Sequence, residues 1–107
     1  MPIIYEVNLK VDASVAKEFK FWLAEHLDLM LQFPGFLRAE YWSELEPSVG
    51  TEGFCVRYEL SDKASFEFYV KEHAARMRQD AFNKFGDKFQ ASRRILKSEL
   101  IRERGDG

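Results

Sequence analysis

The chain has 107 residues, of which 46% are apolar, and its 16 basic and 18 acidic side chains give a formal net charge of -2. This length suits one compact domain over residues 1–107, because single domains commonly run about 100 to 150 residues. The slight acidic excess argues against a general binder of nucleic acid or of anionic membranes, which would carry a basic surplus. No 18 apolar residues occur in succession and no charged segment precedes a long apolar run, so we expect a cytoplasmic protein.

The first half of the chain predicts a strand, a helix and a pair of strands. Residues 3–11 (IIYEVNLKV) alternate in polarity, which is typical of a strand with two unequal faces. Asp12 is expected to cap a helix whose apolar residues recur at helical spacing until Pro34 and Gly35 end it. The segments FLRAEYWSEL and FCVRYEL predict two strands that are joined by the loop EPSVGTEG.

The second half predicts one long helix and a last strand. Asp62 is expected to cap a helix that continues to about Phe85, with Gly86 as its C-terminal signal. KFQASRRILKS predicts the last strand, and residues 98–107 are expected to form a flexible tail. This order of elements predicts the α+β class: a ferredoxin-like βαββαβ sandwich, in which two helices cover one face of a four-stranded antiparallel sheet.

A short repeat supports the division into two halves. FKFWLAEH over residues 19–26 and FEFYVKEH over residues 66–73 agree at both Phe, at Glu and at His. On helical wheels His26 and His73 fall on the apolar faces of their helices, so both imidazoles are expected to point at the sheet. They are either core histidines with internal hydrogen bonds or the lining of a pocket, in which they would donate or accept protons.

The inward face of the predicted sheet is rich in tyrosine. The more apolar face of each strand carries Tyr5, Tyr41 and Tyr58, and Tyr69 lies near the inward face of the second helix. Each buried phenol needs a hydrogen-bond partner, so this layer is either a closed network or the lining of a small cavity. The candidate ligand-binding residues are Tyr5, Trp22, Tyr58, Tyr69, Arg76 and Arg93.

The opposite face of the predicted sheet indicates a homodimer. It carries charges of both signs together with the apolar side chains of Phe36, Trp42 and Leu96. Large apolar groups among pairable charges suggest that the sheet of a second copy covers this face. The alternative is a set of scattered surface side chains, since single exposed apolar residues are common.

The runs YEVNLKVD, FPGF and KEHAARMRQDAFNKFGDKFQASRRIL resemble, in content and order, a family of small bacterial proteins of unknown function. The resemblance covers roughly residues 3–97 and implies the dimeric α/β-barrel fold, shared with the antibiotic-biosynthesis monooxygenases and their haem-degrading relatives. The haem-degrading branch uses an Asn on the first strand, a Trp and a haem-ligating His, to which Asn8, Trp22 and His73 correspond in type. Because Asn8 is expected on the charged face, away from His73, we expect no haem and no other cofactor.

Two further types of site, a catalytic amino-terminal proline and a metal site, would require particular residues. The start MPIIYEVNLKVDASV resembles that of the tautomerase superfamily, in which an amino-terminal proline, here Pro2, acts as a general base once Met1 is removed. The later Gly-rich segments of that superfamily are missing. His26 and His73 are not accompanied by a close cluster of His, Cys or carboxylate side chains, so no metal site is predicted.

These observations favour binding or turnover of a small organic molecule in a cavity between sheet and helices. The two histidines would transfer protons, Tyr5 and Tyr58 would orient the ligand, and Arg93 or Arg76 would receive an anionic group. The alternatives are a non-catalytic dimeric interaction module, a tautomerase that uses Pro2, and a protein similar to the haem-degrading monooxygenases.

Overall fold

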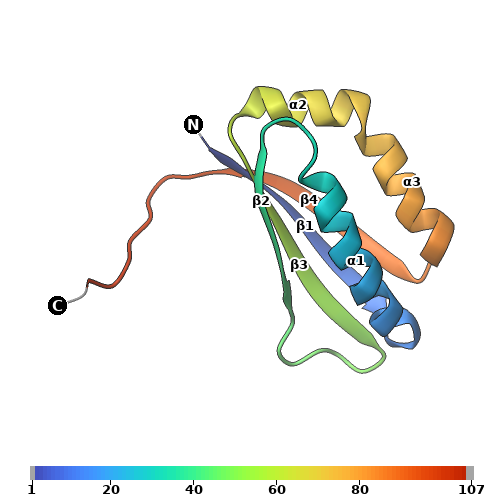
Figure 1. Cartoon of the computed structure of the whole chain (residues 1–107). Helices are drawn as coiled ribbons and strands as arrows, with labels where there is room; N and C mark the ends of the chain where they lie inside the picture. Colours follow the sequence, from blue (N-terminus) through green and yellow to red (C-terminus); the bar gives the residue numbers. More distant parts are fainter. Residues whose placement is uncertain (1, 106–107) are drawn as a thin grey trace.

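The computed structural model describes residues 2–105 and contains one four-stranded antiparallel sheet with helices packed on one face (Figure 1). The elements in chain order are β1 (Ile3–Asp12), the 3-10 helix η1 (Ala13–Val15), α1 (Ala16–Met30), β2 (Phe36–Ser43), β3 (Thr51–Leu60), α2 (Lys63–Glu72), α3 (Ala74–Phe85) and β4 (Phe89–Lys97). The strand order across the sheet is β2-β3-β1-β4. The predicted ferredoxin-like α+β class is therefore confirmed, with three α-helices in place of two.

The central strand β1 sets which side chains face the helices. It pairs antiparallel with β3 and with β4, so that Tyr5 lies beside Tyr58 and Val7 lies between Val56 and Arg93. Side chains in register share a face of the sheet, and these residues all lie on the face that the helices cover.

A β-bulge in β2 moves one residue to the other face. The register with β3 shifts between Phe36 and Arg38, which inserts one extra residue into the strand. Phe36 is consequently buried under the helices, where its ring packs 5.8 Å from that of Tyr58. The prediction that Phe36 shares the outward face with Trp42 is wrong, because a one-residue shift reverses the direction of a strand side chain.

The single helix predicted from Asp62 to about Phe85 is divided in two. α2 ends at Glu72 and α3 begins at Ala74, and His73 between them has φ -131° and ψ -28°, outside the helical region. Figure 1 shows that the two helix axes differ in direction at this point. A helical wheel that continues through His73 therefore does not give the correct inward face of α3.

The outward sheet face centres on a buried carboxylate. Glu6 is 1% exposed and accepts hydrogen bonds from Arg57 Nε at 3.1 Å, from Asn8 Nδ2 at 3.1 Å and from Arg94 Nε. The hydrogen bond from Arg94, assisted by those from Asn8 and Arg57, lowers the pKa of Glu6 to about 2. The indole of Trp42 lies on the same face and is 59% exposed.

The end of the chain leaves the sheet after β4. Residues 98–105 form no helix or strand and extend away from the other elements (Figure 1). Leu100 and Ile101 are exposed along this segment. In the part of the chain that the structure describes, no helix is both long and apolar enough to cross a lipid bilayer.

Candidate functional site

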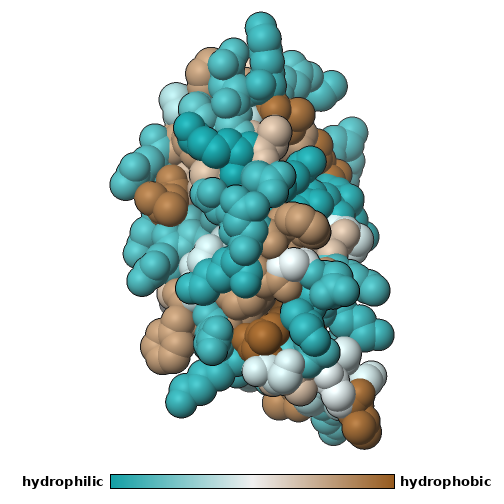
Figure 2. All heavy atoms as spheres, turned by 90° about the vertical axis from the view of Figure 1, so that its right-hand side faces the viewer, coloured by the Kyte–Doolittle hydropathy of each residue, from teal (hydrophilic) through white to brown (hydrophobic). Residues whose placement is uncertain are grey.

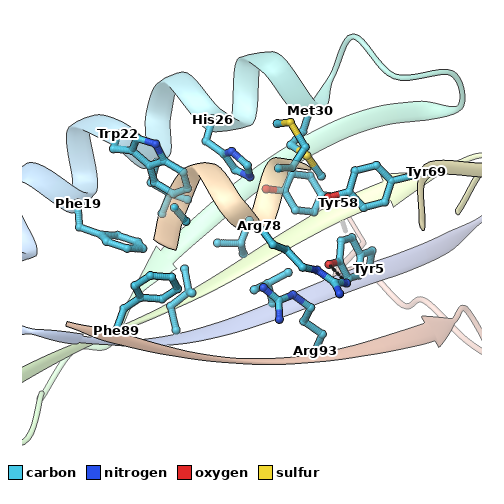
Figure 3. A pocket seen from close by; sticks show the side chains of 16 residues that line it. Tyr5, Phe19, Trp22, His26, Met30, Tyr58, Tyr69, Arg78, Phe89 and Arg93 are labelled. Carbon is cyan, nitrogen blue, oxygen red and sulfur yellow. Dashed lines mark hydrogen bonds between the residues drawn. The ribbon is translucent and has the colours of Figure 1, made fainter. Parts of the chain in front are cut away.

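A small cavity lies between the sheet and the helices (Figure 3). Its volume is about 50 Å³, which is room for a few water molecules. The lining combines apolar walls with phenol, imidazole, indole and guanidinium groups, and contains no Asp or Glu. The lining residues are Tyr5, Val7, Leu9, Phe19, Trp22, Leu23, His26, Met30, Val56, Tyr58, Tyr69, Met77, Arg78, Ala81, Phe89 and Arg93.

The helix α1 supplies one wall of the cavity. Trp22, His26 and Met30 follow one another at intervals of four residues, which places their side chains on one helix face above the sheet. The rings of Trp22 and His26 stack with centroids 4.6 Å apart and an interplanar angle of 19°. The two rings therefore cover a face of each other at the edge of the cavity (Figure 3).

His26 is a neutral imidazole at neutral pH. Burial lowers its pKa to about 4, and the carboxylate of Asp80 opposes this effect. One ring nitrogen therefore donates a hydrogen bond and the other accepts, so the ring can take up a proton from a bound molecule. A pKa near 4 makes it a weak base until a negative charge enters the cavity.

Three phenols form the opposite wall. The ring centroid of Tyr5 lies 5.7 Å from that of Tyr58 and 6.0 Å from that of Tyr69. Burial raises the pKa values of Tyr58 and Tyr69, so both keep their hydroxyl protons and remain hydrogen-bond donors at any physiological pH. The Oη of Tyr5 accepts a 3.4 Å hydrogen bond from Nη2 of Arg78.

His73 and Arg76 lie outside this cavity. The imidazole of His73 stacks on Phe33 with centroids 4.3 Å apart, and its Nδ1 is 3.1 Å from Nη2 of Arg76. The expectation that both histidines share one pocket is therefore wrong, as is the placement of Arg76. That expectation assumed one continuous helix, whereas the helix breaks at His73. Of the aromatic positions that precede the histidines in the repeat, Trp22 and Tyr69 both line the cavity.

Arg78 is a site residue that the sequence reasoning missed. It follows Ala74 by four residues and precedes Ala81 by three, which is the spacing of one helix face within α3. A wheel counted from Ala74 would have placed it beside the buried face. The prediction of one continuous helix from Asp62 to about Phe85 does not place it there.

The residues that the other interpretations require do not fit the cavity. Pro2 is exposed and is not a lining residue, and Met1 lies outside the described residues. Asn8 bonds to Glu6 on the outward face, away from His73 as expected, and the cavity is far smaller than a porphyrin. Haem therefore does not fit. Within residues 2–105, no three His, Cys, Asp or Glu side chains are grouped to hold a metal ion.

The sequence over residues 2–99 matches a family described as a domain of unknown function, DUF4286. The chain belongs to this family. A search of curated proteins finds no match. The family thus names no reaction for the cavity of this DUF4286 chain.

Solved structures confirm the ferredoxin-like fold of the single chain. SnoaB, a cofactor-independent oxygenase from Streptomyces nogalater, matches with a TM-score of 0.73 and 13% identity over 94% of this chain and 97% of its own. A putative antibiotic biosynthesis monooxygenase from Deinococcus radiodurans gives 0.71 and 15%, over 96% and 99%. The heme-degrader MhuD from Mycobacterium tuberculosis, with two hemes bound in its active site, gives 0.66 and 18%, over 94% and 99%. Identities this low establish a shared fold and no shared reaction.

Proposed function

We propose that this protein binds or turns over a small organic molecule in the cavity between the sheet and α1, α2 and α3. The observation that carries the proposal is the convergence of three phenols, one neutral imidazole and two guanidiniums on a single apolar-walled space. Ligand sites commonly combine apolar walls with a few convergent polar groups. A core evolved only for stability would place apolar side chains at such positions.

The polar groups have distinct roles in this proposal. His26 accepts or returns a proton, because it is neutral and lies against the cavity. Tyr58 and Tyr69 donate hydrogen bonds that orient the ligand, and Trp22 stacks on a planar ligand. Tyr5, Trp22, Tyr58, Tyr69, His26 and Arg93 all line the cavity, which supports keeping them as candidate site residues.

The size of the cavity limits the ligand. An apolar cavity of about 150 Å³ accepts benzene, whereas this one has about 50 Å³ in the unliganded protein. Met30 and Met77 line it, and their unbranched side chains can change rotamer to admit a larger group. A ligand of at most one ring is therefore compatible with modest movement.

We also propose that the outward sheet face binds a second copy of the chain. The helix side in Figure 2 is mostly hydrophilic, with separated apolar side chains, which is typical of a solvent-facing surface. The outward sheet face instead combines Trp42 with charges of both signs, including Arg38 and Glu40, 3.3 Å apart. A sheet with this pattern can pair its charges with those of an identical sheet.

The cytoplasmic location stays a prediction.

Filling the cavity tests the ligand proposal. Replacing Ala81, which lines the cavity and is 7% exposed, with Leu should abolish ligand binding and cost about 1 to 3 kcal/mol through overpacking. Ligand binding is measured by thermal unfolding with a panel of small acids, amides and phenols, because a ligand that binds the folded state raises the melting temperature of the protein. The matched control is Ala75→Leu, at an exposed position of the same helix.

The panel separates a ligand site from a closed core. We expect at least one compound to stabilise the wild type and the control, and none to stabilise Ala81→Leu. If no compound stabilises the wild type, or if the filled variant responds equally, the non-catalytic interaction module becomes the better interpretation.

A further inference from the structure

We propose that the ligand is a monoanion: a carboxylate on a planar body of at most one ring, with the carboxylate held between Arg78 and Arg93. This inference rests on the proposed function, because it assigns a chemical class to the ligand of the same cavity. It is carried by the two guanidiniums at one side of the cavity and by their surroundings.

The two arginines reach the cavity from different elements. Arg78 projects from α3 and Arg93 from the edge strand β4, and both are lining residues that remain exposed to solvent. Figure 3 shows their guanidiniums close to the hydroxyl of Tyr5, to which Arg78 donates. Their stems thus contribute to the cavity wall while their charged ends stay hydrated, an arrangement that costs little in desolvation.

Neither guanidinium is neutralised within the described chain. The ion pairs of residues 2–105 involve other cations: Lys20, Arg38, Arg57, Lys63, Arg94 and Lys97. No lining residue is acidic, and Asp80, whose carboxylate acts on His26, forms no ion pair with either arginine. One carboxylate of a ligand can pair with both guanidiniums, because the N–H donors of arginine fit the two carboxylate oxygens.

The rest of the lining selects the body of the molecule. The cavity is lined by Trp22 and by the rings of Tyr5, Tyr58 and Tyr69, and such aromatic walls favour a planar ligand. Tyr58 and Tyr69 offer hydroxyl donors and no charge. A second anionic group deeper in the cavity would meet no cation, because the lining holds only Arg78 and Arg93 as permanent cations.

Titration calorimetry with benzoate and benzamide tests the charge requirement. The two probes share one ring and differ in charge at the group that would meet the arginines. We expect benzoate to bind the wild type at least about tenfold more tightly than benzamide, since a hydrogen bond to a charged group is worth more than a neutral one. Arg78→Met and Arg93→Met should each weaken benzoate binding by about tenfold and leave benzamide within about twofold.

A matched control removes general electrostatics as an explanation. Arg76→Met deletes the same charge from the same helix at a residue outside the cavity, so benzoate affinity should stay within about twofold. The charge inference is overturned if benzamide binds as tightly as benzoate, if both cavity variants keep wild-type affinity, or if Arg76→Met loses as much as they do. Absence of binding by both probes, with no compound of the wider panel stabilising the protein, would instead overturn the proposed function itself.

Discussion

Replacing Trp42 with Glu is expected to dissociate the proposed dimer into monomers. Trp42 is 59% exposed on the outward face of the edge strand β2 and pairs with Cys55 of the adjacent β3, so it lies within the proposed sheet-to-sheet contact. A carboxylate buried there without a partner costs several kcal/mol, which weakens association by more than about a hundredfold. Sedimentation velocity at micromolar concentration measures the change directly.

The helix side offers a control for this substitution. Phe82 of α3 is 58% exposed, so Phe82→Glu makes the same chemical change at nearly the same exposure. It should leave the proposed dimer intact. A monomeric wild type, or equal dissociation by both variants, would contradict the proposed use of the sheet face.

The pairing around Glu6 explains why an identical sheet can cover this face. Arg57 and Arg94 already neutralise Glu6 within one chain, and their side chains are 48% and 63% exposed. The carboxylate therefore enters the contact with its partners in place, and only the outer parts of the arginines remain to be desolvated. A face with an unpaired Glu6 would resist such burial.

Burial of His26 is expected to make the protein less stable as the pH falls from about 6.5 to about 4. The folded-state pKa is lowered to about 4, so in this interval the unfolded chain binds a proton at His26 and the folded chain does not. Stability must then decrease as the pH decreases. The shift corresponds to at most about 3 kcal/mol, which contact with the open side of the cavity reduces to about 2.

Urea unfolding of His26→Phe across this pH range tests both the titration and the cavity. The variant should lose most of the pH dependence above about pH 5.5, because Glu6 contributes its own acid instability only below that pH. At pH 7 its stability should lie within about 1 kcal/mol of the wild type or exceed it, because a phenyl ring needs no hydrogen-bond partner. His73→Phe, outside the cavity, should keep the slope that His26 causes.

The opposite outcome would support a closed core. If His26 belongs to a filled hydrogen-bonded network, its replacement leaves buried hydroxyls without partners and costs about 1 to 3 kcal/mol per group. A loss of this size in His26→Phe at pH 7 would count against a ligand cavity.

Local periodicity predicted most of the fold because β1 and β3 are regular. Their alternation runs without interruption, so Tyr5, Val7 and Tyr58 face the helices as expected. It failed at Phe36 because a bulge changes the face of a strand without a strong local signal. Bulges depend on how the partner strand pairs, which a single strand sequence does not specify.

The site was partly predictable for the same reason. Trp22 and His26 lie on one uninterrupted helix, and counting residues placed both correctly against the sheet. His73, Arg76 and Arg78 lie at or after the break between α2 and α3, where the count no longer holds. No Gly or Pro marks that break in KEHAARM, so the sequence carries no local signal for it.

The methionine methyl spectrum of the protein tests most directly whether the cavity receives a ligand. Met30 from α1 and Met77 from α3 both line it, and 13C-labelled methyl groups report on their immediate surroundings. We predict that benzoate shifts both signals together and saturably in the wild type, and that Ala81→Leu abolishes both shifts. If neither signal moves with millimolar benzoate or with any compound of the panel, the space under the helices is a closed core and not a binding site.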